Sequence, residues 1–331
     1  MKTLGEFELI ERYFKRPARR AALGVGDDCA LLAPAPGMQL AVSCDMLVEG
    51  RHFLSTVDPV LLGHKALAVN LSDLAACGAK PLAFTLALAL PRAEAKWLEP
   101  FARGLLALAD EHGCELIGGD TTQGPLNICI TVFGELPTGQ ALLRSGATAG
   151  DDLYVSGNVG DARLALEVFR GTVSVPGALF ELARARMEQP TPRVALGLAL
   201  RGLATAAIDI SDGLLGDLGH ILKQSGVGAS VDTEAVVSRV AARAASAAVE
   251  PLAGMTVAPA QWLAWALAGG DDYELLFTAP RAQRAAVLAA SKASQTPVTR
   301  IGRIEAEPGL RLLDGQGQSV PNRYTSFDHF G

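Results

Sequence analysis

The sequence lacks an excess of basic residues. Its 331 residues include 29 Lys and Arg against 35 Asp and Glu, which gives a formal net charge of −6 and an isoelectric point near 5.5. Nucleic acids and anionic membranes are bound by basic surfaces, so we expect neither as the main partner. An acidic protein can still bind phosphates where metal ions lie between the two sets of negative charge.

The sequence also lacks the signatures of disulfide-rich, zinc-binding and membrane-spanning proteins. The number of cysteines, five, is odd, and no two of them form a CxxC pair. This pattern favours buried thiols in a reducing cytoplasm over disulfides or a zinc site. The most apolar stretch, residues 66–90, is interrupted by polar residues and by Pro81 well short of a bilayer-spanning run. The first residues, MKTLGEFELIERYF, carry acidic residues early and are unlike a signal peptide. We therefore expect a cytoplasmic protein.

Three common nucleotide-binding signatures are missing. No GxxxxGK[ST] segment occurs, which excludes a P-loop enzyme. No HRD and DFG arrangement occurs, which excludes the protein-kinase fold. The segment SGNVGDA at residues 156–162 is rich in glycine but does not match the dinucleotide fingerprint, and we interpret it as an ordinary strand-to-helix turn. Any use of a nucleotide must therefore depend on other residues.

The length and the apolar content predict two domains. A chain of 331 residues with 49 % apolar and 19 % charged residues has enough material for two buried cores. The stretch 137–150 is rich in Gly, Thr and Ser, and we place the boundary there, with domains at 1–138 and 139–331. Strand and helix patterns mix in both halves, which predicts two α/β or α+β domains.

The spacing of apolar residues predicts the main elements. Helices are expected over residues 5–15, 58–78, 94–112, 160–170, 177–188, 193–202 and 281–292. Strands are expected over residues 39–46, 84–90, 114–117, 127–136, 152–156, 273–278 and 299–304. The run FTLALAL at 84–90 is typical of a strand buried on both faces. Trp262 and Trp265, three residues apart, are interpreted as core residues.

Six segments place aspartates next to glycine or serine where an apolar run ends: GVGDDCA, SCD, NLSD, GGDTTQG, DISDG and GGDDYE. A single segment of this kind is usually a turn. However, Asp73 and Asp209 lie within apolar surroundings, where a carboxylate is costly unless it is paired or bound to a metal. Aspartate oxygens suit Mg²⁺, and glycine lets the backbone approach a phosphate. The set therefore favours metal-assisted phosphoryl transfer.

The motifs together resemble the thiamine-monophosphate kinase family, in chain order and over nearly the whole length. The matching segments are GVGDDCALL, LVEGRHF, HKALAVNLSDLAACGAKP, LIGGDTTQGP, LLRSGATAGD, AIDISDGLLGDLGH, GGDDYELLF and the closing FDHF. The family belongs to a superfamily with aminoimidazole ribonucleotide synthetase, selenophosphate synthetase and a hydrogenase-maturation protein. The resemblance implies an N-terminal sheet domain that dimerises, a C-terminal α/β domain and an active site between them.

The resemblance also implies roles for individual residues. Positions that bind magnesium are Asp28, Ser43, Cys44, Asp45, Asp73, Asp120, Asp209 and Asp212. Positions that contact ATP are Gly119, Asp120, Arg144 and Ser211, and positions that contact the thiamine substrate are His52, Asp271 and Phe327. Among these, Asp45, Asp120 and Arg144 are the expected catalytic residues. Three positions depart from the family pattern: Cys44 stands where threonine is usual, Asp271 where glutamate is more common, and Phe327 where relatives can carry an aromatic residue with a polar tip.

The reaction that the resemblance implies is transfer of the γ-phosphoryl group of ATP to thiamine monophosphate, giving thiamine diphosphate and ADP, with several Mg²⁺ ions. The nucleophile is a phosphate oxygen, and because a phosphate monoester has a second pKa of about 6, it needs no strong base at neutral pH. We therefore expect direct in-line transfer with no phosphoenzyme. The expected partners are thiamine monophosphate, ATP and a second copy of the chain.

Two alternatives stay open at this stage. The first is another enzyme of the superfamily, of the selenophosphate or aminoimidazole ribonucleotide type. The selenophosphate enzyme would carry a reactive cysteine in a glycine-rich N-terminal loop, and Cys29 follows GDD here, although in a context that also suits the thiamine family. The second is a nucleotide-binding homologue that has lost catalysis. Cysteine in place of threonine at position 44 is the one departure among the acidic motifs that favours it. Measured turnover separates these alternatives.

Overall fold

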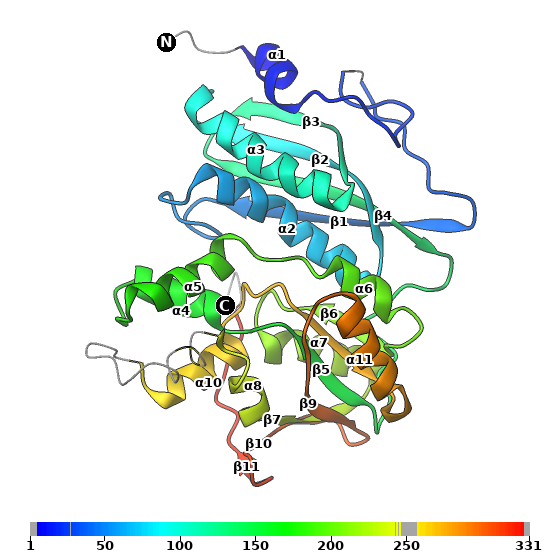
Figure 1. Cartoon of the computed structure of the whole chain (residues 1–331), viewed down its shortest axis with the longest axis vertical. Coiled ribbons are helices and arrows are strands. Elements are labelled where there is room, and N and C mark those ends of the chain that lie inside the picture. The colour runs from blue at the N-terminus through cyan, green and yellow to red at the C-terminus, as the bar shows by residue number, and fades with distance from the viewer. Residues whose placement is uncertain (1–4, 27, 242, 244, 246–256, 328–331) are drawn as a thin grey trace. The chain divides into compact units, whose positions relative to one another are not determined.

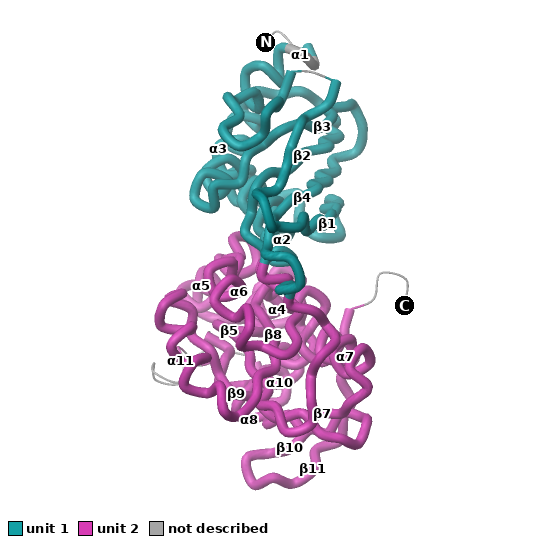
Figure 2. The backbone as a smooth tube through the Cα atoms, turned by 90° about the vertical axis from the view of Figure 1, so that its right-hand side faces the viewer, with its two compact units in different colours: residues 1–74, 79–141 teal, residues 75–78, 142–331 magenta. Residues whose placement is uncertain are grey.

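The computed structural model describes residues 5–26, 28–241, 243, 245 and 257–327. The chain divides into two compact units (Figure 2). Unit 1 comprises Met1–Leu74 and Ala79–Ala141, and unit 2 comprises Ala75–Gly78 and Leu142–Gly331. Each unit contains its own sheet and its own helices, as expected for two mixed α/β domains.

Unit 1 is built on a four-stranded sheet of order β1-β4-β2-β3. The central strand β4 pairs antiparallel with both neighbours, whereas β2 and β3 run parallel. Parallel neighbours need a crossover connection, which the helix α3 (Ala95–His112) supplies. The strands are β1 (Met38–Val48), β2 (Lys80–Leu90), β3 (Glu115–Gln123) and β4 (Asn127–Pro137).

The helices α2 (Pro59–Cys77) and α3 lie side by side over one face of this sheet (Figure 1). Their backbones touch, because a Cβ on Gly63 would lie 2.1 Å from the Phe101 carbonyl oxygen and one on Gly104 would lie 1.9 Å from that of Val60. By length and hydropathy alone, α2 could cross a membrane, but 67 % of its most apolar window is buried within the protein. It is the central core helix of unit 1.

The opposite face of the sheet is largely open in the single chain. Burial alternates along residues 84–90, and Ala87 is exposed, so the expectation that this strand is buried on both faces was wrong. On β1, the apolar residues Leu40, Val42 and Met46 are 41 %, 58 % and 52 % exposed. One end of this face is covered, because Ala21 packs there against Ala83 and Ile117. The rest forms an exposed apolar surface, which we call the open sheet face.

The N-terminal segment differs in detail from the expected helix over 5–15. A short helix α1 (Glu6–Leu9) passes into a π-helical turn, Ile10–Phe14, in which the Lys15 N–H donates to the Ile10 carbonyl oxygen at 2.9 Å. The segment that follows is attached to the sheet domain by hydrogen bonds. The main-chain N–H groups of Arg19 and Arg20 both donate to the carboxylate of Glu115, at 3.0 Å.

Unit 2 is built on a seven-stranded sheet of order β11-β10-β7-β9-β5-β8-β6. The pairs β5–β8, β5–β9, β6–β8 and β7–β9 are antiparallel, and β7–β10 is parallel. Both β5 and β8 are buried along their whole length. The strands are β5 (Asp152–Ser156), β6 (Ala206–Asp209), β7 (Gly228–Asp232), β8 (Leu275–Ala279), β9 (Val298–Glu305), β10 (Gly309–Leu313) and β11 (Ser319–Val320).

Helices pack around this sheet to close a single hydrophobic core. Trp262 and Trp265 belong to it, with their rings edge to face at 5.4 Å, which confirms their interpretation as core residues. The helices are α4 (Asp161–Phe169), α5 (Gly177–Glu188), α6 (Val194–Leu200), α7 (Leu214–Ser225), α8 (Thr233–Val237), α10 (Pro259–Ala268) and α11 (Arg284–Ala293), the last preceded by a 3-10 turn, Arg281–Gln283.

Candidate active site

In unit 1, the strand β1 and the helix α2 bring three of the predicted metal-binding residues together. The Ser43 hydroxyl donates a hydrogen bond to the carboxylate of Asp73. The main-chain N–H of Asp45 donates to the side-chain oxygen of Asn70 at 3.1 Å. Asn70 is itself fixed, because its amide group donates to the Ala66 carbonyl oxygen at 3.0 Å. The polar face of the α2 segment NLSD is thus held against alternate residues of β1.

The two carboxylates of this group repel each other. Burial and the negative charge of Asp73 raise the pKa of Asp45 to about 7. Such a pair of hard oxygen donors, partly removed from water and with a hydroxyl beside it, fits a divalent cation such as Mg²⁺, which would offset the repulsion. The donor set on the helix-covered face of β1 is therefore suited to the predicted metal.

Cys44 lies between Ser43 and Asp45 on the strand, so its side chain projects from the opposite face of the sheet. Its Sγ atom lies 3.5 Å from Sγ of Cys129 on β4. The thiol is therefore turned away from the Ser43 and Asp45 side chains, and only the main-chain carbonyl group of Cys44 is left to act with them. A hydroxyl group at this position would also project from that opposite face, away from the Ser43 and Asp45 side chains.

The other predicted residues of unit 1 are more dispersed. Gly119 and Asp120 lie in the middle of β3, opposite Leu86 and Ala87 of β2, and both are exposed. Asp28 is exposed in the segment before β1. Among the residues that the structure describes, no three His, Cys, Asp or Glu side chains converge on one point. The structure thus groups Ser43, Asp45 and Asp73 and leaves Asp28 and Asp120 outside that group.

His52 lies in the turn that follows β1. Its Nδ1 atom accepts a hydrogen bond from the Val48 main-chain N–H at 3.0 Å. A ring nitrogen that accepts an N–H carries no hydrogen itself, so the hydrogen of the neutral ring is on Nε2. The turn therefore orients the imidazole so that Nε2 can donate a hydrogen bond.

In unit 2, two of the aspartate-containing segments form neighbouring loops, DISDG at 209–213 and GGDDYE at 269–274. The Asp271 N–H donates to the Ser211 carbonyl oxygen at 2.7 Å. The Phe327 N–H, from the C-terminal segment, donates to the Asp212 carbonyl oxygen at 3.1 Å. The structure thus brings Ser211, Asp212, Asp271 and Phe327 together, with Asp209 buried at the end of β6 just before them.

The first of these loops is organised by Asp217, a residue that the sequence analysis did not single out. Its Oδ2 atom accepts three consecutive main-chain N–H groups, those of Ser211, Asp212 and Gly213, at 3.1 to 3.2 Å. Burial and the charge of Asp212 raise the pKa of Asp217 to about 7, against the opposing effect of these hydrogen bonds. The amide groups of the loop are therefore used internally rather than offered to a phosphate.

Arg144 is exposed on the segment that leads into unit 2. Its main chain is fixed, because its carbonyl oxygen accepts a hydrogen bond from the Ser225 hydroxyl at 3.3 Å. The preceding carbonyl oxygen, of Leu143, accepts the N–H of Ala207 on β6 at 2.8 Å. Since β6 ends at Asp209, the guanidinium group of Arg144 extends from a segment docked beside the strand that carries the DISDG loop.

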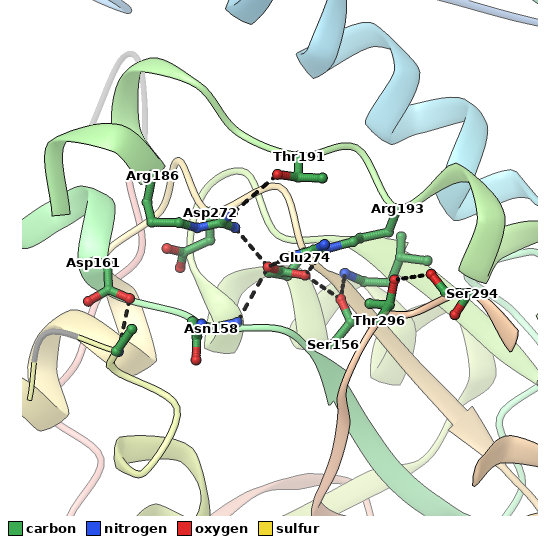
Figure 3. A network of polar contacts seen from close by, with 12 residues as sticks. Ser156, Asn158, Asp161, Arg186, Thr191, Arg193, Asp272, Glu274, Ser294 and Thr296 are labelled. Carbon is green, nitrogen blue, oxygen red and sulfur yellow. Dashed lines mark hydrogen bonds and ion pairs between the residues drawn. The ribbon is translucent and has the colours of Figure 1, made fainter. Parts of the chain in front are cut away.

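The second loop ends in a buried cluster of charges that the sequence analysis also missed (Figure 3). Glu274 is fully buried, and two arginines donate to its carboxylate: Arg186 at 2.8 Å and Arg193 at 2.5 and 2.6 Å. The Ser156 hydroxyl donates at 2.5 Å and the Asn158 N–H at 3.3 Å. We call these five residues the Glu274 cluster. Glu274 is the last residue of the GGDDYE motif, in which only Asp271 had been assigned a role.

The loop that Glu274 ends has an unusual backbone. Asp271 and Tyr273 have φ values of 64° and 51°, and these residues belong to a short group of non-glycine residues with positive φ in the described part of the chain. The left-handed region costs a non-glycine residue about 1 to 2 kcal/mol, so it persists only where surrounding contacts enforce it. The Tyr273 N–H, which donates to the Ile210 carbonyl oxygen at 2.8 Å, is one such contact.

The chain is similar to known proteins over most of its length. The family described as AIR synthase related protein, N-terminal domain, matches residues 26–136, and its C-terminal domain matches residues 148–315. The thiamine-monophosphate kinase of Salmonella typhimurium is 46 % identical over 98 % of both chains. The chain belongs to the thiamine-monophosphate kinase family.

Solved structures of this family support the assignment. The crystal structure of thiamine-monophosphate kinase from Stenotrophomonas maltophilia K279a is 44 % identical, with a TM-score of 0.81, over 94 % of this chain and 95 % of that one. The structure of AaThiL complexed with AMPPCP and TMP is 28 % identical, with a TM-score of 0.74, over 90 % of this chain and 89 % of that one. The two-domain fold expected from the motifs is thus confirmed.

Proposed function

We propose that this protein is a thiamine-monophosphate kinase, which transfers the γ-phosphoryl group of ATP to thiamine monophosphate and releases thiamine diphosphate and ADP. The observation that carries the proposal is the 46 % identity over 98 % of both chains to a thiamine-monophosphate kinase. A relative, AaThiL, has been solved with AMPPCP and TMP, which are the two kinds of ligand that this reaction requires.

We propose that several Mg²⁺ ions take part. Ser43, Asp45 and Asp73 would hold one of them, and their partly buried, mutually repelling oxygens support this assignment. Bound Mg²⁺ would neutralise charge on the phosphates during transfer. The remaining proposed metal-binding residues are Asp28, Asp120, Asp209, Asp212 and the main-chain carbonyl group of Cys44.

The other proposed roles divide between nucleotide and acceptor. Gly119, Asp120, Arg144 and Ser211 would contact ATP, and Arg144 would offset the negative charge of the phosphates. His52 would donate from Nε2 to the substrate phosphate, which agrees with the hydrogen bond that its Nδ1 accepts from Val48. Asp271 and the half-exposed ring of Phe327 would contact the thiamine part.

The chemistry needs no general base. The acceptor phosphate, with a second pKa of about 6, is largely a dianion at neutral pH and can attack directly. The main barrier is repulsion between two sets of negative charge, which the cationic side of the site would reduce. We propose in-line transfer with no phosphoenzyme and with Asp45, Asp120 and Arg144 as catalytic residues. Denaturing the enzyme during turnover with labelled ATP should leave no label on the protein, and a trapped aspartyl-phosphate would refute direct transfer.

The two domains would have separate tasks. Residues 1–138 would bind ATP and Mg²⁺ and form a homodimer, and residues 139–331 would supply the remaining active-site residues. The open sheet face supports dimerisation, because an apolar surface of this kind is usually covered by a partner. The protein would work in the cytoplasm, where its five free thiols stay reduced.

The test of the function is an ADP-release assay with purified protein, ATP and Mg²⁺, in which the product is identified by mass. Thiamine monophosphate is compared with thiamine, with aminoimidazole precursors and with selenide. Mg²⁺-dependent formation of thiamine diphosphate is expected. Turnover only with another acceptor would keep the fold and overturn the substrate, and no turnover with any acceptor would indicate an inactive homologue.

A further inference from the structure

The acidic residues of the GGDDYE loop alternate between two environments. Asp272 and Glu274 are buried, at 4 % and 0 % exposure, whereas Asp271 and Tyr273 are only partly buried. The buried pair is attached to the turn that follows β5, because Asp272 accepts the Gly160 N–H at 2.9 Å and Glu274 accepts the Asn158 N–H at 3.3 Å. The alternate residues are thereby presented on the other side of the loop.

The Glu274 cluster joins four parts of unit 2 at one carboxylate. Ser156 and Asn158 come from the end of β5 and the turn after it, Arg186 from α5, and Arg193 from the residue before α6. The Ser156 hydroxyl also accepts the N–H of Leu275 at 2.8 Å, so the side chain and the backbone at this point share one anchor. A buried carboxylate with two cationic donors has a fixed position, since any displacement leaves buried charges unpaired.

The main chain of Glu274 transmits this fixed position to the neighbouring loop. Its carbonyl oxygen accepts the Ile210 N–H at 2.8 Å, and the Tyr273 N–H donates back to the Ile210 carbonyl oxygen at 2.8 Å. Next to this pair, the Asp271 N–H donates to the Ser211 carbonyl oxygen at 2.7 Å. Asp271 and Tyr273, the two residues with positive φ, are therefore held by hydrogen bonds to Ser211 and Ile210 and by the fixed position of Glu274 that follows them.

We infer that Glu274, with Arg186 and Arg193, positions Asp271 for recognition of the phosphoryl acceptor. The side chains of Glu274, Arg186 and Arg193 have no assigned contact with the substrate. They act on Asp271 through the backbone of the loop. The inference rests on the proposed function, in which Asp271 contacts the thiamine part of the substrate. It adds that selectivity for this acceptor depends on a charge cluster in the interior of unit 2.

The chain offers a matched control in Asp152, at the opposite end of β5. Its side chain is also fully buried, and it also binds two arginines: Arg284 at 2.5 and 2.8 Å and Arg300 at 3.5 Å. It lies four residue steps along the strand from Ser156, a distance of about 13 Å. Replacing Asp152 with Asn thus damages another buried carboxylate with two arginine partners in the same sheet, away from the loop, although these arginines are more exposed than Arg186 and Arg193.

The experiment compares Glu274→Gln with Asp152→Asn by steady-state kinetics and by hydrogen exchange. In Glu274→Gln we expect the KM for thiamine monophosphate to rise about tenfold or more, with the KM for ATP changed less than about twofold. The amides of Asp271 and Tyr273 should exchange faster than in the wild type. In Asp152→Asn, stability should fall while both KM values and the exchange rates of these two amides stay unchanged.

Arg186→Lys is a second variant, for use if Glu274→Gln does not fold. It loses one hydrogen bond and keeps the charge, so it should show a smaller change of the same kind.

Each outcome decides one claim. Equal KM values and equal exchange in Glu274→Gln and the wild type, or equal losses in both buried-carboxylate variants, would overturn the positioning role. A wild type that makes no thiamine diphosphate would overturn the proposed function instead. Exchange at Asp271 and Tyr273 would then decide the positioning role without turnover, because it reports on the loop whichever acceptor the enzyme uses.

Discussion

Gly157 lies directly against the carboxylate of Glu274, so that a Cβ at this position would be 2.0 Å from Oε1. The residue also has a φ of 51°, in the left-handed region. The close approach leaves no room for a side chain, and the left-handed φ favours glycine. The backbone of the SGNVGD turn therefore lies against the Glu274 cluster. The turn that the sequence presented as an unremarkable connection is thus one wall of a buried charge site.

Replacement of Gly157 by Ala should therefore be severe. We expect a loss of about 3 kcal/mol or more in the free energy of unfolding, because the methyl group adds overpacking to the cost of the left-handed backbone. Gly171→Ala is the control, since Gly171 has a φ of 71° but no atom within 4 Å of the added Cβ, and it should cost only about 1 to 2 kcal/mol. Urea denaturation of both variants measures the difference, and similar losses would contradict the packing argument.

Replacement of Asp45 by Asn should abolish most of the activity without unfolding the protein. The variant keeps the size of the side chain but removes one of the two carboxylates that would hold Mg²⁺. We expect kcat for thiamine diphosphate formation to fall about 100-fold or more. Asp110→Asn is the matched control in unit 1, because Asp110 is an exposed partner of Arg16, and its activity should stay within about twofold of the wild type. Full activity of Asp45→Asn would remove Asp45 from the proposed metal site.

The stability of the protein should depend on pH through Asp272. Burial raises the pKa of this carboxyl group well above its usual value, and the charge of Asp161 adds to the effect. An unfolded Asp titrates near pH 3.9, as a reference value. Between that pH and the raised pKa, the folded state holds a proton that the unfolded state has lost, so stability falls as pH rises through this window.

The variant Asp272→Asn removes this dependence while it keeps an oxygen to accept the Gly160 N–H. Its Tm should match that of the wild type near pH 4 and exceed it by an amount that grows toward pH 8. Thermal melts at several pH values measure the effect. A Tm difference that stays constant with pH would show that the Asp272 carboxyl group does not hold the extra proton.

The open sheet face should be the dimer interface. Val42→Asp places a charge on this face and should convert a dimer into a monomer, because an unpaired charge cannot be buried in an apolar contact. The control is Leu288→Asp on α11, since Leu288 is 56 % exposed, close to the 58 % of Val42, but lies in unit 2. Sedimentation velocity distinguishes the two masses. A monomeric wild type, or a dimeric Val42→Asp variant, would overturn the proposed interface.

Much of the fold could be predicted because its longest elements have clear periodic patterns. The helices over 58–78 and 94–112 were confirmed to within a residue or two as α2 and α3. The strands between 206 and 232 were missed, because β6 and β7 have only four and five residues and are buried throughout most of their length, so they show no alternation. Strand β3 extends through GGDTTQ to Gln123, whereas the expected strand ended at residue 117, because the glycine and polar residues that follow show no apolar pattern.

The organisation of the site was harder to predict than its aspartates. Asp271 could be predicted because it lies in a segment with glycine beside aspartate, but the contacts that fix it come from residues far apart in the chain. Arg193 and Ser156 are separated from Glu274 by 81 and 118 residues. Nothing in the local sequence relates them, since the pairing depends on how α5, α6 and β5 pack. Asp217 was missed for another reason, because a carboxylate in a first helical turn is usually an ordinary terminal charge.

The carboxylate of Asp217 has a further consequence for how the enzyme meets its ligands. It occupies the three amide groups of the DISDG loop in the way that an external anion would. The loop is therefore already shaped before any ligand arrives, and its conformational entropy is lost once, during folding, rather than at every turnover. Free phosphate and sulfate in the cell would also find these amides taken, so common anions would not compete for them. A side chain of the protein thus takes the place of a bound anion at these amides.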